Sequence, residues 1–508
     1  MLLYVCLFSG LGALGLVGPD EPRYAAIARA MAETHDWVTP RLWGTPWFEK
    51  PVLYYWLAGI AMRIFGVSEF AARLPSALAA LLAVAAIKWT ALRSYGVGAA
   101  YFSVLMLPTS VAMIGFSRAA GPDMLFAGLL AAAMAVAVEM LQKPRPGPIP
   151  RVAFGFFLGA AVLAKGPAAV ILAGGSTLLW AALSRQWRAP FRFLHPLIVA
   201  VFCATALPWY VLCALRNPDF LRVFIWQHNF ERYLTPIFEH RQPFWFYGPI
   251  LLLAIFPWIL FLLGAFPDGI KSLRRKSFSD SPNLFFVCWA VFPVLFFSIS
   301  QSKLPGYILP AIPPVFVPLG NWVSESMNEN RRIVLRVLGW TGALFMILAI
   351  PFLAETTAGF RGMERPEYAI AGDVAFLMGL AVVIFAFRGR LKPAFFVLLL
   401  LVASTVEVAN TMVLPRLDTR ISARPVARRL HSEDPDLSDI YTYQLSRNWE
   451  YGMDFYVNRA LPEWNPAVGE PKWILGWVPT RQFLNDYESD LEQFSPEYPH
   501  PLSLFRRR

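Results

Sequence analysis

The sequence has little charge and few cysteines. Only 16% of its 508 residues are charged, whereas soluble globular domains have about 25% charged residues. The four cysteines lie inside apolar runs, which argues against a disulfide framework. We find no long internal repeat and no low-complexity stretch. These absences exclude a soluble domain held by disulfides and a repeat protein.

Apolar residues and positive charge are what the chain has in excess. Hydrophobic residues make up 56% of it, and the formal net charge is +11. A basic protein that binds nucleic acid carries its cations on one folded surface. Here they fall in short loops between apolar runs, the pattern of the cytoplasmic loops of membrane proteins. We therefore expect the lipid bilayer, and no nucleic acid, as a partner.

Long apolar runs set the fold class. A helix needs roughly 20 apolar residues to cross the hydrocarbon core, and thirteen segments approach that length. The first run has no basic leader and no small-residue cleavage site, so we interpret it as an uncleaved span. We expect an all-α polytopic membrane protein. The candidate spans lie at about residues 2–17, 72–92, 98–115, 123–141, 152–165, 167–183, 193–214, 244–264, 284–300, 306–322, 333–353, 372–387 and 393–412.

The basic loops predict the orientation of these spans. If the acidic pair after the first span lies outside, sixteen basic residues in six short loops all fall inside, as the positive-inside rule requires. A wrong number of spans would have broken this alternation. The sixteen are Arg93, Lys143, Arg145, Arg151, Arg185, Arg188, Arg192, Lys271, Arg274, Arg275, Lys276, Arg331, Arg332, Arg388, Arg390 and Lys392.

Two regions then lie outside. Residues 18–71 contain two stretches with helical spacing, PRYAAIARAMAETHDW and PVLYYWLAGIAMRIFG, which we expect to lie flat in the membrane interface. Residues 415–508 are more polar. In them ISARPVARRLHSEDPD predicts a helix, and DIYTYQL, DFYVNR and KWILGWV predict strands. We therefore predict a membrane domain over 1–414 and a small α/β domain over 415–508.

The same outer side collects acids and cations. Each has a local explanation: Asp20, Glu21 or Asp123 could cap a helix N-terminus, and a lysine could reach from the membrane to the interface. Together they favour chemistry, because acids activate nucleophiles and cations bind phosphate. The loop 215–243 adds His228 and Arg232, although a lone histidine does not establish a metal site. This pattern indicates an enzyme that uses a donor linked to a lipid phosphate.

Several segments carry a family resemblance. They are DEPRYAAIARAM, DWVTP, FEKPVLYYW, LAKGP, HNFERY, HRQPFWFY and KLPGYILP, in this order within the first 320 residues. Together they resemble the lipid A aminoarabinose transferase family, GT-C glycosyltransferases distantly related to protein O-mannosyltransferases. The resemblance implies a GT-C fold of about thirteen spans, with interfacial helices after the first span and a small periplasmic C-terminal domain.

The resemblance also implies an activity. A polyprenyl (undecaprenyl) phosphate donor would give its sugar, with inversion, to lipid A or another envelope glycan. The reaction would take place at the periplasmic face of the bacterial inner membrane. From the residues alone, a transporter of lipid-linked sugars and a non-catalytic scaffold stay open as alternatives, as does a protein acceptor. Neither the sugar nor the acceptor is specified.

Candidate site residues follow from the pattern and the resemblance together. The catalytic candidates are Asp20, Glu21 and Asp123. The candidates for binding the donor phosphate are Lys50, Lys165, Arg232, Lys303 and Tyr307. Glu49 and His228 match positions of a divalent metal site, so a metal cofactor is implied by the resemblance alone.

Overall fold

The computed structural model describes residues 1–143, 145–234, 242–273, 282–353, 365–434, 437, 439–465, 471–477, 487–489 and 502–507. The chain divides into two compact units. Unit 1 comprises residues 1–9, 48–54 and 75–407, and unit 2 comprises residues 10–47, 55–74 and 408–508.

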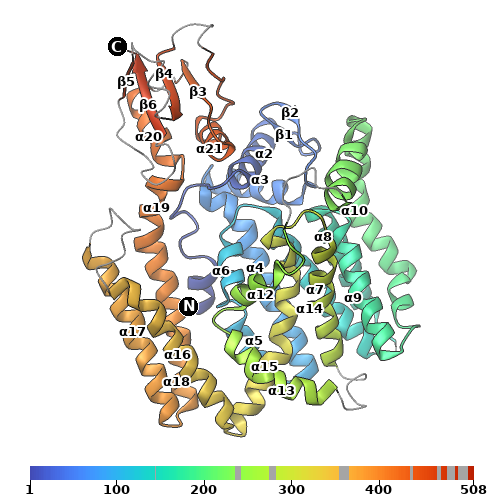
Figure 1. Cartoon of the computed structure of the whole chain (residues 1–508). Helices are drawn as coiled ribbons and strands as arrows, with labels where there is room; N and C mark the ends of the chain where they lie inside the picture. The colour runs from blue at the N-terminus through green and yellow to red at the C-terminus, as the bar shows by residue number, and fades with distance from the viewer. Residues whose placement is uncertain are drawn as a thin grey trace. The chain divides into compact units, whose positions relative to one another are not determined.

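Unit 1 is a bundle of helices (Figure 1). Proline at the first helical position starts three of the long ones, where its fixed φ suits the helix and its missing N–H costs nothing. The helices are α1 (Leu2–Leu7), α4 (Glu69–Tyr95), α5 (Val97–Met106), α6 (Val111–Ser117), α7 (Pro122–Gln142), α8 (Pro148–Lys165), α9 (Ala168–Ser184), η1 (Pro190–Leu194), α10 (Pro196–Arg216), η2 (Arg222–Glu231), α11 (Arg232–Leu234), α12 (Tyr247–Ile255), α13 (Ile259–Leu273), α14 (Pro282–Ile299), η4 (Pro305–Ala311), α15 (Ile312–Asn328), α16 (Arg332–Leu353), α17 (Arg365–Phe387) and α18 (Leu391–Val408).

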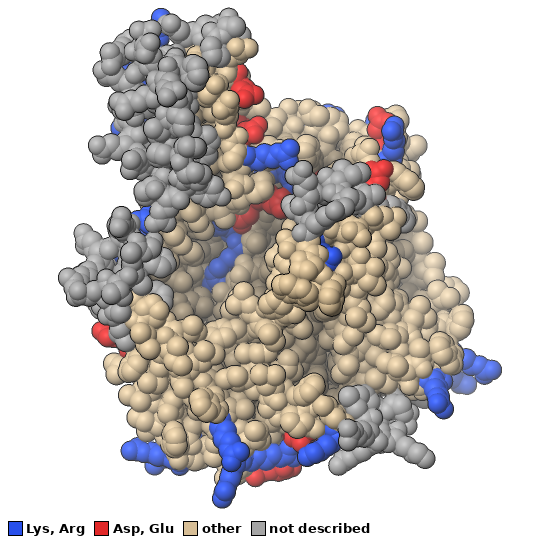
Figure 2. Space-filling view, viewed as in Figure 1, with Lys and Arg blue, Asp and Glu red and all other residues tan. Residues whose placement is uncertain are grey.

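These helices confirm a polytopic α-helical membrane protein. In the part of the chain that the structure describes, seven helices are long and apolar enough to cross a membrane, or nine if each bent pair is one span. Helix α7 is the most enclosed of them, with 94% of its apolar window buried. Lys and Arg gather along the lower edge of the view, below α13, α15 and α18, while the helical face above is almost uniformly uncharged (Figure 2).

Two of the predicted spans are broken helices. The helix axis bends by 59° between α5 and α6, and by 107° between α12 and α13. The two breaks bond to each other: the Val111 N–H donates to the Phe256 carbonyl at 2.9 Å, and Trp258 Nε1 donates to Thr109 Oγ1 at 3.0 Å. A break inside an apolar layer needs such partners, because no water is there to replace the lost helical bonds. The candidate spans over 98–115 and 244–264 are therefore each formed by a bent pair of helices.

The first predicted span is also interrupted. Helix α1 ends at Leu7, so one continuous helix over residues 2–17 is wrong. The Arg118 guanidinium donates to the carbonyls of Val5 at 2.8 Å and Ser9 at 3.0 Å, and also bonds the Cys6 carbonyl. Val5 and Cys6 belong to the last turn of α1, whose carbonyls the end of a helix leaves unbonded, and Ser9 follows the helix. An arginine distant in sequence thus stabilises the end of α1.

Unit 2 contains shorter helices, an antiparallel pair of short strands, β1 and β2, and a four-stranded sheet. The helical spacing predicted for 18–71 is confirmed by α2 and α3. The elements are α2 (Asp20–Thr34), β1 (Arg41–Leu42), β2 (Thr45–Pro46), α3 (Leu53–Phe65), η6 (Ala409–Val413), α19 (Leu414–Ile421), α20 (Arg424–Glu433), β3 (Ile440–Tyr443), α21 (Arg447–Val457), β4 (Trp473–Trp477), β5 (Tyr487–Ser489) and β6 (Leu502–Arg507).

The sheet has the strand order β3-β4-β6-β5. Strands β3 and β4 are parallel, and the other two pairs are antiparallel. Val426 and Leu430 of α20 pack with Ile440 and Trp473 to form its core. The predicted helix at 424 and the strands DIYTYQL and KWILGWV are confirmed. DFYVNR is not a strand: its first four residues form the last turn of α21, and Asn458 ends the helix in a left-handed conformation.

An irregular segment of unit 2 follows α1 and is held by Arg73. The Arg73 guanidinium donates to the carbonyls of Leu11 at 2.8 Å, Leu14 at 2.6 Å and Gly15 at 2.8 Å. It also forms a two-point ion pair with Glu21, at 3.1 and 2.7 Å. Arginine suits this position because its planar group presents five donors at once.

A second arginine bonds the same segment from α20. Arg424 donates to the carbonyls of Gly12 at 2.9 Å and Ala13 at 3.1 Å, and its guanidinium pairs with Asp418 at 2.7 and 2.8 Å. Asp418 in turn accepts the Gly15 N–H at 2.7 Å. Gly15 fits closely here, since a Cβ would lie 2.0 Å from the Ser422 hydroxyl and 2.9 Å from Asp418 Oδ1, so a larger residue would have to displace these side chains. Side chains therefore replace the helical bonds that this apolar segment does not make.

Candidate functional site

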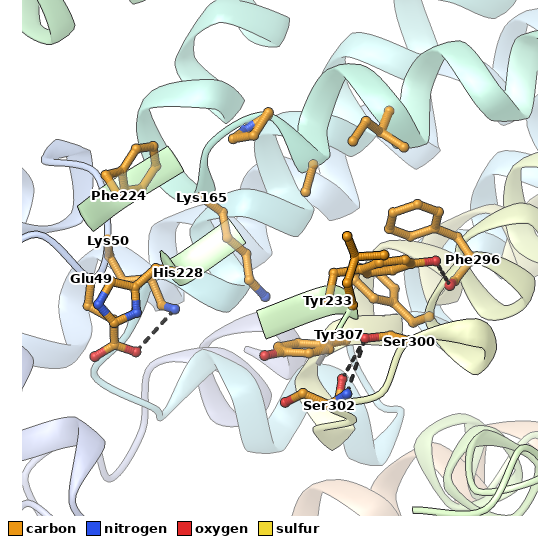
Figure 3. Close-up of a pocket in the computed structure, with 15 residues that line it drawn as sticks. Glu49, Lys50, Lys165, Phe224, His228, Tyr233, Phe296, Ser300, Ser302 and Tyr307 are labelled. Atoms are coloured by element: carbon orange, nitrogen blue, oxygen red, sulfur yellow. Dashed lines mark hydrogen bonds and ion pairs between the residues drawn. The ribbon is translucent and has the colours of Figure 1, made fainter. Parts of the chain in front are cut away.

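A cavity of about 370 Å³ lies in unit 1 (Figure 3). Four segments far apart in sequence wall it: residues 49–50, 165–171, 224–234 and 296–307. Its lining is mostly apolar and aromatic. It brings together five of the predicted site residues: Glu49, Lys50, Lys165, His228 and Tyr307.

One end of the cavity holds Glu49, Lys50 and His228. The Lys50 ammonium lies 3.3 Å from Glu49 Oε1, and His228 lies beside the pair in Figure 3. Phe48 anchors this segment by packing edge-on against Phe220, with ring centres 5.2 Å apart. Pro51 disfavours a helix at the residue before it, so α3 starts only at Leu53 and the two charged side chains stay on a turn.

Lys165 points into the middle of the cavity, between this charged end and the aromatic side chains (Figure 3). It is the last residue of α8, and its ammonium pairs with the carboxylate of Asp123 in the first turn of α7. A cation at a helix C-terminus and an anion at an N-terminus are both favoured by the helix dipoles. Gly306 fits against this pair, as a Cβ there would lie 3.0 Å from Asp123 Oδ2.

Aromatic side chains form the opposite wall. The Lys165 ammonium lies 4.8 Å from the centre of the Tyr307 ring, close enough for a cation–π contact. The Tyr233 ring stacks on Phe296 at 4.8 Å, and its hydroxyl donates to the Phe296 carbonyl at 2.8 Å. Burial raises the pKa of Tyr233, which keeps this hydroxyl protonated as a donor. Tyr307 packs against Phe297 at 5.0 Å.

Lys303 lies next to the cavity without lining it. Its side chain is buried, and its ammonium donates to the carbonyls of Ser300 at 2.6 Å and Gln242 at 3.0 Å. These bonds tie the turn after α14 to residue 242. Contact between Lys303 and a phosphate stays a prediction.

Asp20 and Glu21 belong to unit 2 and have different surroundings. Neither caps α2, whose N-cap is Pro19. Asp20 is exposed and pairs with Arg23 one turn later, whereas Glu21 is buried against Arg73 and accepts the Val17 N–H at 2.9 Å. The remaining donor-phosphate candidate, Arg232, begins α11, and its side chain lies outside the described residues.

The metal implied by resemblance lacks a full ligand set among the described residues. Glu49 and His228 line the same cavity, but no group of three or more His, Cys, Asp or Glu side chains in the described ranges could hold an ion. Zinc sites use at least three protein ligands, whereas Mg²⁺ is usually held by one or two carboxylates together with substrate phosphates. We therefore derive no step through a metal.

Ten of the fifteen lining residues were not among the predicted site residues, and two of these, Tyr233 and Phe296, stack on each other. Tyr233 lies within the HNFERY segment, so the resemblance to the family could have signalled it. Phe296 lies in a run of phenylalanines on α14, where nothing in the local pattern separates a cavity wall from a lipid-facing side chain. Phe296 is recognised as part of the cavity wall only because α14 packs against Tyr233 in the folded chain.

Comparison with known proteins places this chain in a family. The model of the family described as dolichyl-phosphate-mannose-protein mannosyltransferase matches residues 49–209. Over 367 residues the chain is 33% identical to the undecaprenyl phosphate-alpha-4-amino-4-deoxy-L-arabinose arabinosyl transferase of Edwardsiella ictaluri, covering 70% of this chain and 66% of that one. The chain belongs to the arabinosyl transferase family of GT-C glycosyltransferases.

A second arabinosyl transferase, from Aeromonas salmonicida, is 32% identical over 384 residues, or 73% of this chain and 66% of its own length. The matched region thus spans about two thirds of these relatives. The crystal structure of ArnT from Cupriavidus metallidurans bound to undecaprenyl phosphate superimposes with a TM-score of 0.79 at 25% identity, covering 99% of this chain and 96% of that one. The arabinosyl transferase family therefore shares this fold along nearly the whole chain.

Proposed function

We propose that this chain transfers a sugar from a polyprenyl phosphate donor to an acceptor of the bacterial envelope. The cavity in unit 1 is the observation that carries the proposal. Lys50 and Lys165 face a space whose other walls are largely apolar and aromatic. A ligand that satisfies both features has an anionic head on an apolar chain, which describes a lipid phosphate.

Undecaprenyl phosphate is the donor lipid that we propose. The curated relatives are named for a sugar carried on this lipid, and the ArnT crystal structure contains the lipid itself. We propose a lipid A-type glycan as the acceptor. A protein acceptor is the second candidate, because the matching family model is described as a protein mannosyltransferase.

In the proposed reaction the acceptor oxygen attacks the anomeric carbon of the sugar from the side opposite the phosphate. The bond from that carbon to the phosphate oxygen breaks, and the electron pair leaves with the lipid phosphate. Lys50 and Lys165 stabilise the charge of the leaving phosphate. Asp123 holds Lys165 in place through their ion pair.

We propose that the Asp20 carboxylate acts on the acceptor. Asp20 is exposed, and Arg23 pairs with only its Oδ1, whereas both Glu21 oxygens bond Arg73. Asp20 would remove the proton of an acceptor hydroxyl, or position an acceptor phosphate that is already ionised. A general base contributes about 10²–10⁴-fold to a rate.

A transfer assay with the full chain in lipid nanodiscs tests this proposal. The wild type should release undecaprenyl phosphate and glycosylate lipid A, and Asp20→Asn should lower the rate at least about 100-fold while binding donor normally. Arg63→Ala, a change at an exposed residue of α3, serves as a control for the substitution procedure. In sealed vesicles, movement of intact donor across the bilayer without release of undecaprenyl phosphate would indicate a transporter instead.

We also propose the finer topology. Thirteen spans would place residues 18–71 and the domain over 415–508 in the periplasm, as the sixteen basic residues on the opposite side support. A cysteine at Thr45, in the exposed strand β2, should react with an impermeant thiol reagent in intact spheroplasts. A cysteine at Lys271 serves as the opposite control and should react only after lysis. Protection of Thr45→Cys until lysis would contradict the orientation.

A further inference from the structure

A second cavity, of about 440 Å³, lies in unit 2 and shares no residue with the site above. Helix α2 supplies one wall through Arg29, and helix α20 supplies another. The turn at residues 67–69 and the end of α21 complete it. Four of its lining residues are arginine or histidine, against one acid, Glu69.

The basic residues of α20 lie on one helical face. Arg424, Arg428 and His431 are spaced by four and three residues, which places them one above another. Ala427, on the same face, leaves room between them. The sequence of α20 therefore directs three nitrogen-bearing side chains into a single cavity.

The single acid and the deepest arginine neutralise each other. Glu69 accepts a hydrogen bond from the Tyr456 hydroxyl at 2.7 Å and pairs with Arg424 at 3.3 Å. Arg424 also pairs with Asp418, which lies outside the cavity lining. These residues form a rigid base with little charge left for a ligand.

In the described ranges, the other basic residues of the cavity have fewer carboxylate partners than Arg424. Arg428 is exposed, and within the described part of the chain no carboxylate pairs with it. His431 Nδ1 lies 2.8 Å from the Ala427 carbonyl, which can only accept, so Nδ1 carries a hydrogen. Arg29 pairs with Glu33 at 2.7 Å and donates to the Phe455 carbonyl at 3.3 Å, which holds its guanidinium beside the opening.

The place of this cavity along the chain points to a source for its ligand. Glu69 begins α4, an apolar helix long enough to cross a membrane. Arg424 follows by three residues the end of another such segment, Leu391–Ile421. The cavity is thus built from residues of unit 2 at the ends of two segments long enough to span a membrane, and lipid phosphates lie at the ends of such segments.

We propose that this cavity binds the phosphate monoester of a membrane lipid headgroup through Arg428, His431 and Arg29. A free phosphate has the same chemistry and is the alternative source. The inference goes beyond the proposed transfer reaction and does not depend on it, since neither lysine of the first cavity takes part.

Binding to the full chain in phosphatidylcholine nanodiscs tests the proposal. Glucosamine 6-phosphate is titrated by calorimetry as the soluble monoester. Phosphatidic acid, a lipid monoester, is compared with phosphatidylglycerol, a lipid diester, by retention in native mass spectrometry. Arg428→Ala should weaken monoester binding about fivefold, the usual upper limit for one exposed charge pair. Arg428→Glu should weaken it further.

Arg429→Ala is the matched control, since Arg429 is exposed on the same helix but does not line the cavity. Retention of phosphatidic acid over phosphatidylglycerol, lost in Arg428→Ala and kept in Arg429→Ala, supports a lipid headgroup. Binding of glucosamine 6-phosphate alone with the same variant pattern supports the phosphate site but assigns it a soluble ligand. No binding by the wild type, or equal losses in both variants, would overturn the proposal. These readouts involve no sugar transfer, so they are distinct from a failure of the proposed function.

Discussion

Arg73 in unit 2 and Lys165 in unit 1 are both cations paired with a carboxylate, yet their surroundings differ. The Arg73 side chain is 4% exposed, and Glu21 and three backbone carbonyls bond its guanidinium. Lys165 pairs with Asp123 and points its ammonium into a cavity beside an aromatic ring. The first arrangement is closed to any ligand, and the second presents charge to an open space.

This difference separates a structural ion pair from a binding group. A buried charge is tolerated when partners satisfy all of its donors, and then it holds backbone in place. A charge that faces a cavity keeps electrostatic free energy available for a ligand. The neighbouring acids of α2 repeat the contrast, because Glu21 is buried in a network and Asp20 is exposed at the surface.

Removing Arg73 should have the largest effect on stability. Arg73→Ala leaves the Glu21 carboxylate buried without its cation and should cost about 3–5 kcal/mol. Arg73→Lys should rescue little of this, because an ammonium cannot reproduce the planar fork. Thermal unfolding of the purified full chain measures both variants. Arg63→Ala, at an exposed residue of α3, should change stability by no more than about 0.5 kcal/mol. A melting temperature of Arg73→Lys equal to that of the wild type would contradict the closed network.

Asp454 is a buried acid that forms no ion pair within the described residues, unlike Glu21, which pairs with Arg73. Burial raises the pKa of Asp454 from 3.8 to about 7, against a hydrogen bond from the Leu461 N–H and with a small contribution from Glu450. Between these pH values the folded state keeps a proton that the unfolded state has released, so stability falls as pH rises. Above pH 7 Asp454→Asn should gain at most about 4 kcal/mol relative to the wild type.

The difference between the two unfolding profiles isolates this one group. It should grow from pH 4 to pH 7 and stay constant above. An Asn variant whose stability follows the wild-type profile at every pH would show that Asp454 is not desolvated.

Lys50 is a cation that faces the cavity of unit 1. Its substitution should have the smallest free-energy effect of the three residues Arg73, Asp454 and Lys50. A charge-assisted contact contributes about 1.5–3 kcal/mol, so Lys50→Ala should weaken donor binding roughly 10–150-fold. Its melting temperature should stay close to that of the wild type, unlike that of Arg73→Ala. Lys88→Ala, at an exposed lysine of α4 outside the cavity, is the control. Unchanged donor binding in a folded Lys50→Ala protein would remove Lys50 from the site.

Composition and periodicity predicted much of the fold because membrane spans are local features. A run of apolar residues is itself the reason a helix enters the bilayer, so helices appeared where the runs were. The helical spacing of 18–71 and two of three strands in the tail were predicted for similar reasons. DFYVNR misled because aromatic and β-branched residues suit both a strand and a buried helical face.

Interruptions of the apolar runs could not be predicted, because their causes lie far away in sequence. The glycines of MLLYVCLFSGLGALGLV weaken its helix, and Gly10 has a φ of +74°, but they do not by themselves place the stop at Leu7. Arg118, Arg73 and Arg424 supply the bonds that let the backbone leave the helix. The two bent helix pairs are similar, since each break is bonded by the other.

The sequence by itself determined a helical membrane protein, its family and most of the charged residues now found at the cavity of unit 1. Those features depend on residue type and on order along the chain. Only the tertiary structure decided which charges are open. Asp20 and Glu21 are adjacent in sequence and chemically alike, yet Arg73 encloses one and leaves the other exposed. A charge becomes structural or available according to the donors that folding brings to it, and those donors come from segments that sequence proximity does not reveal.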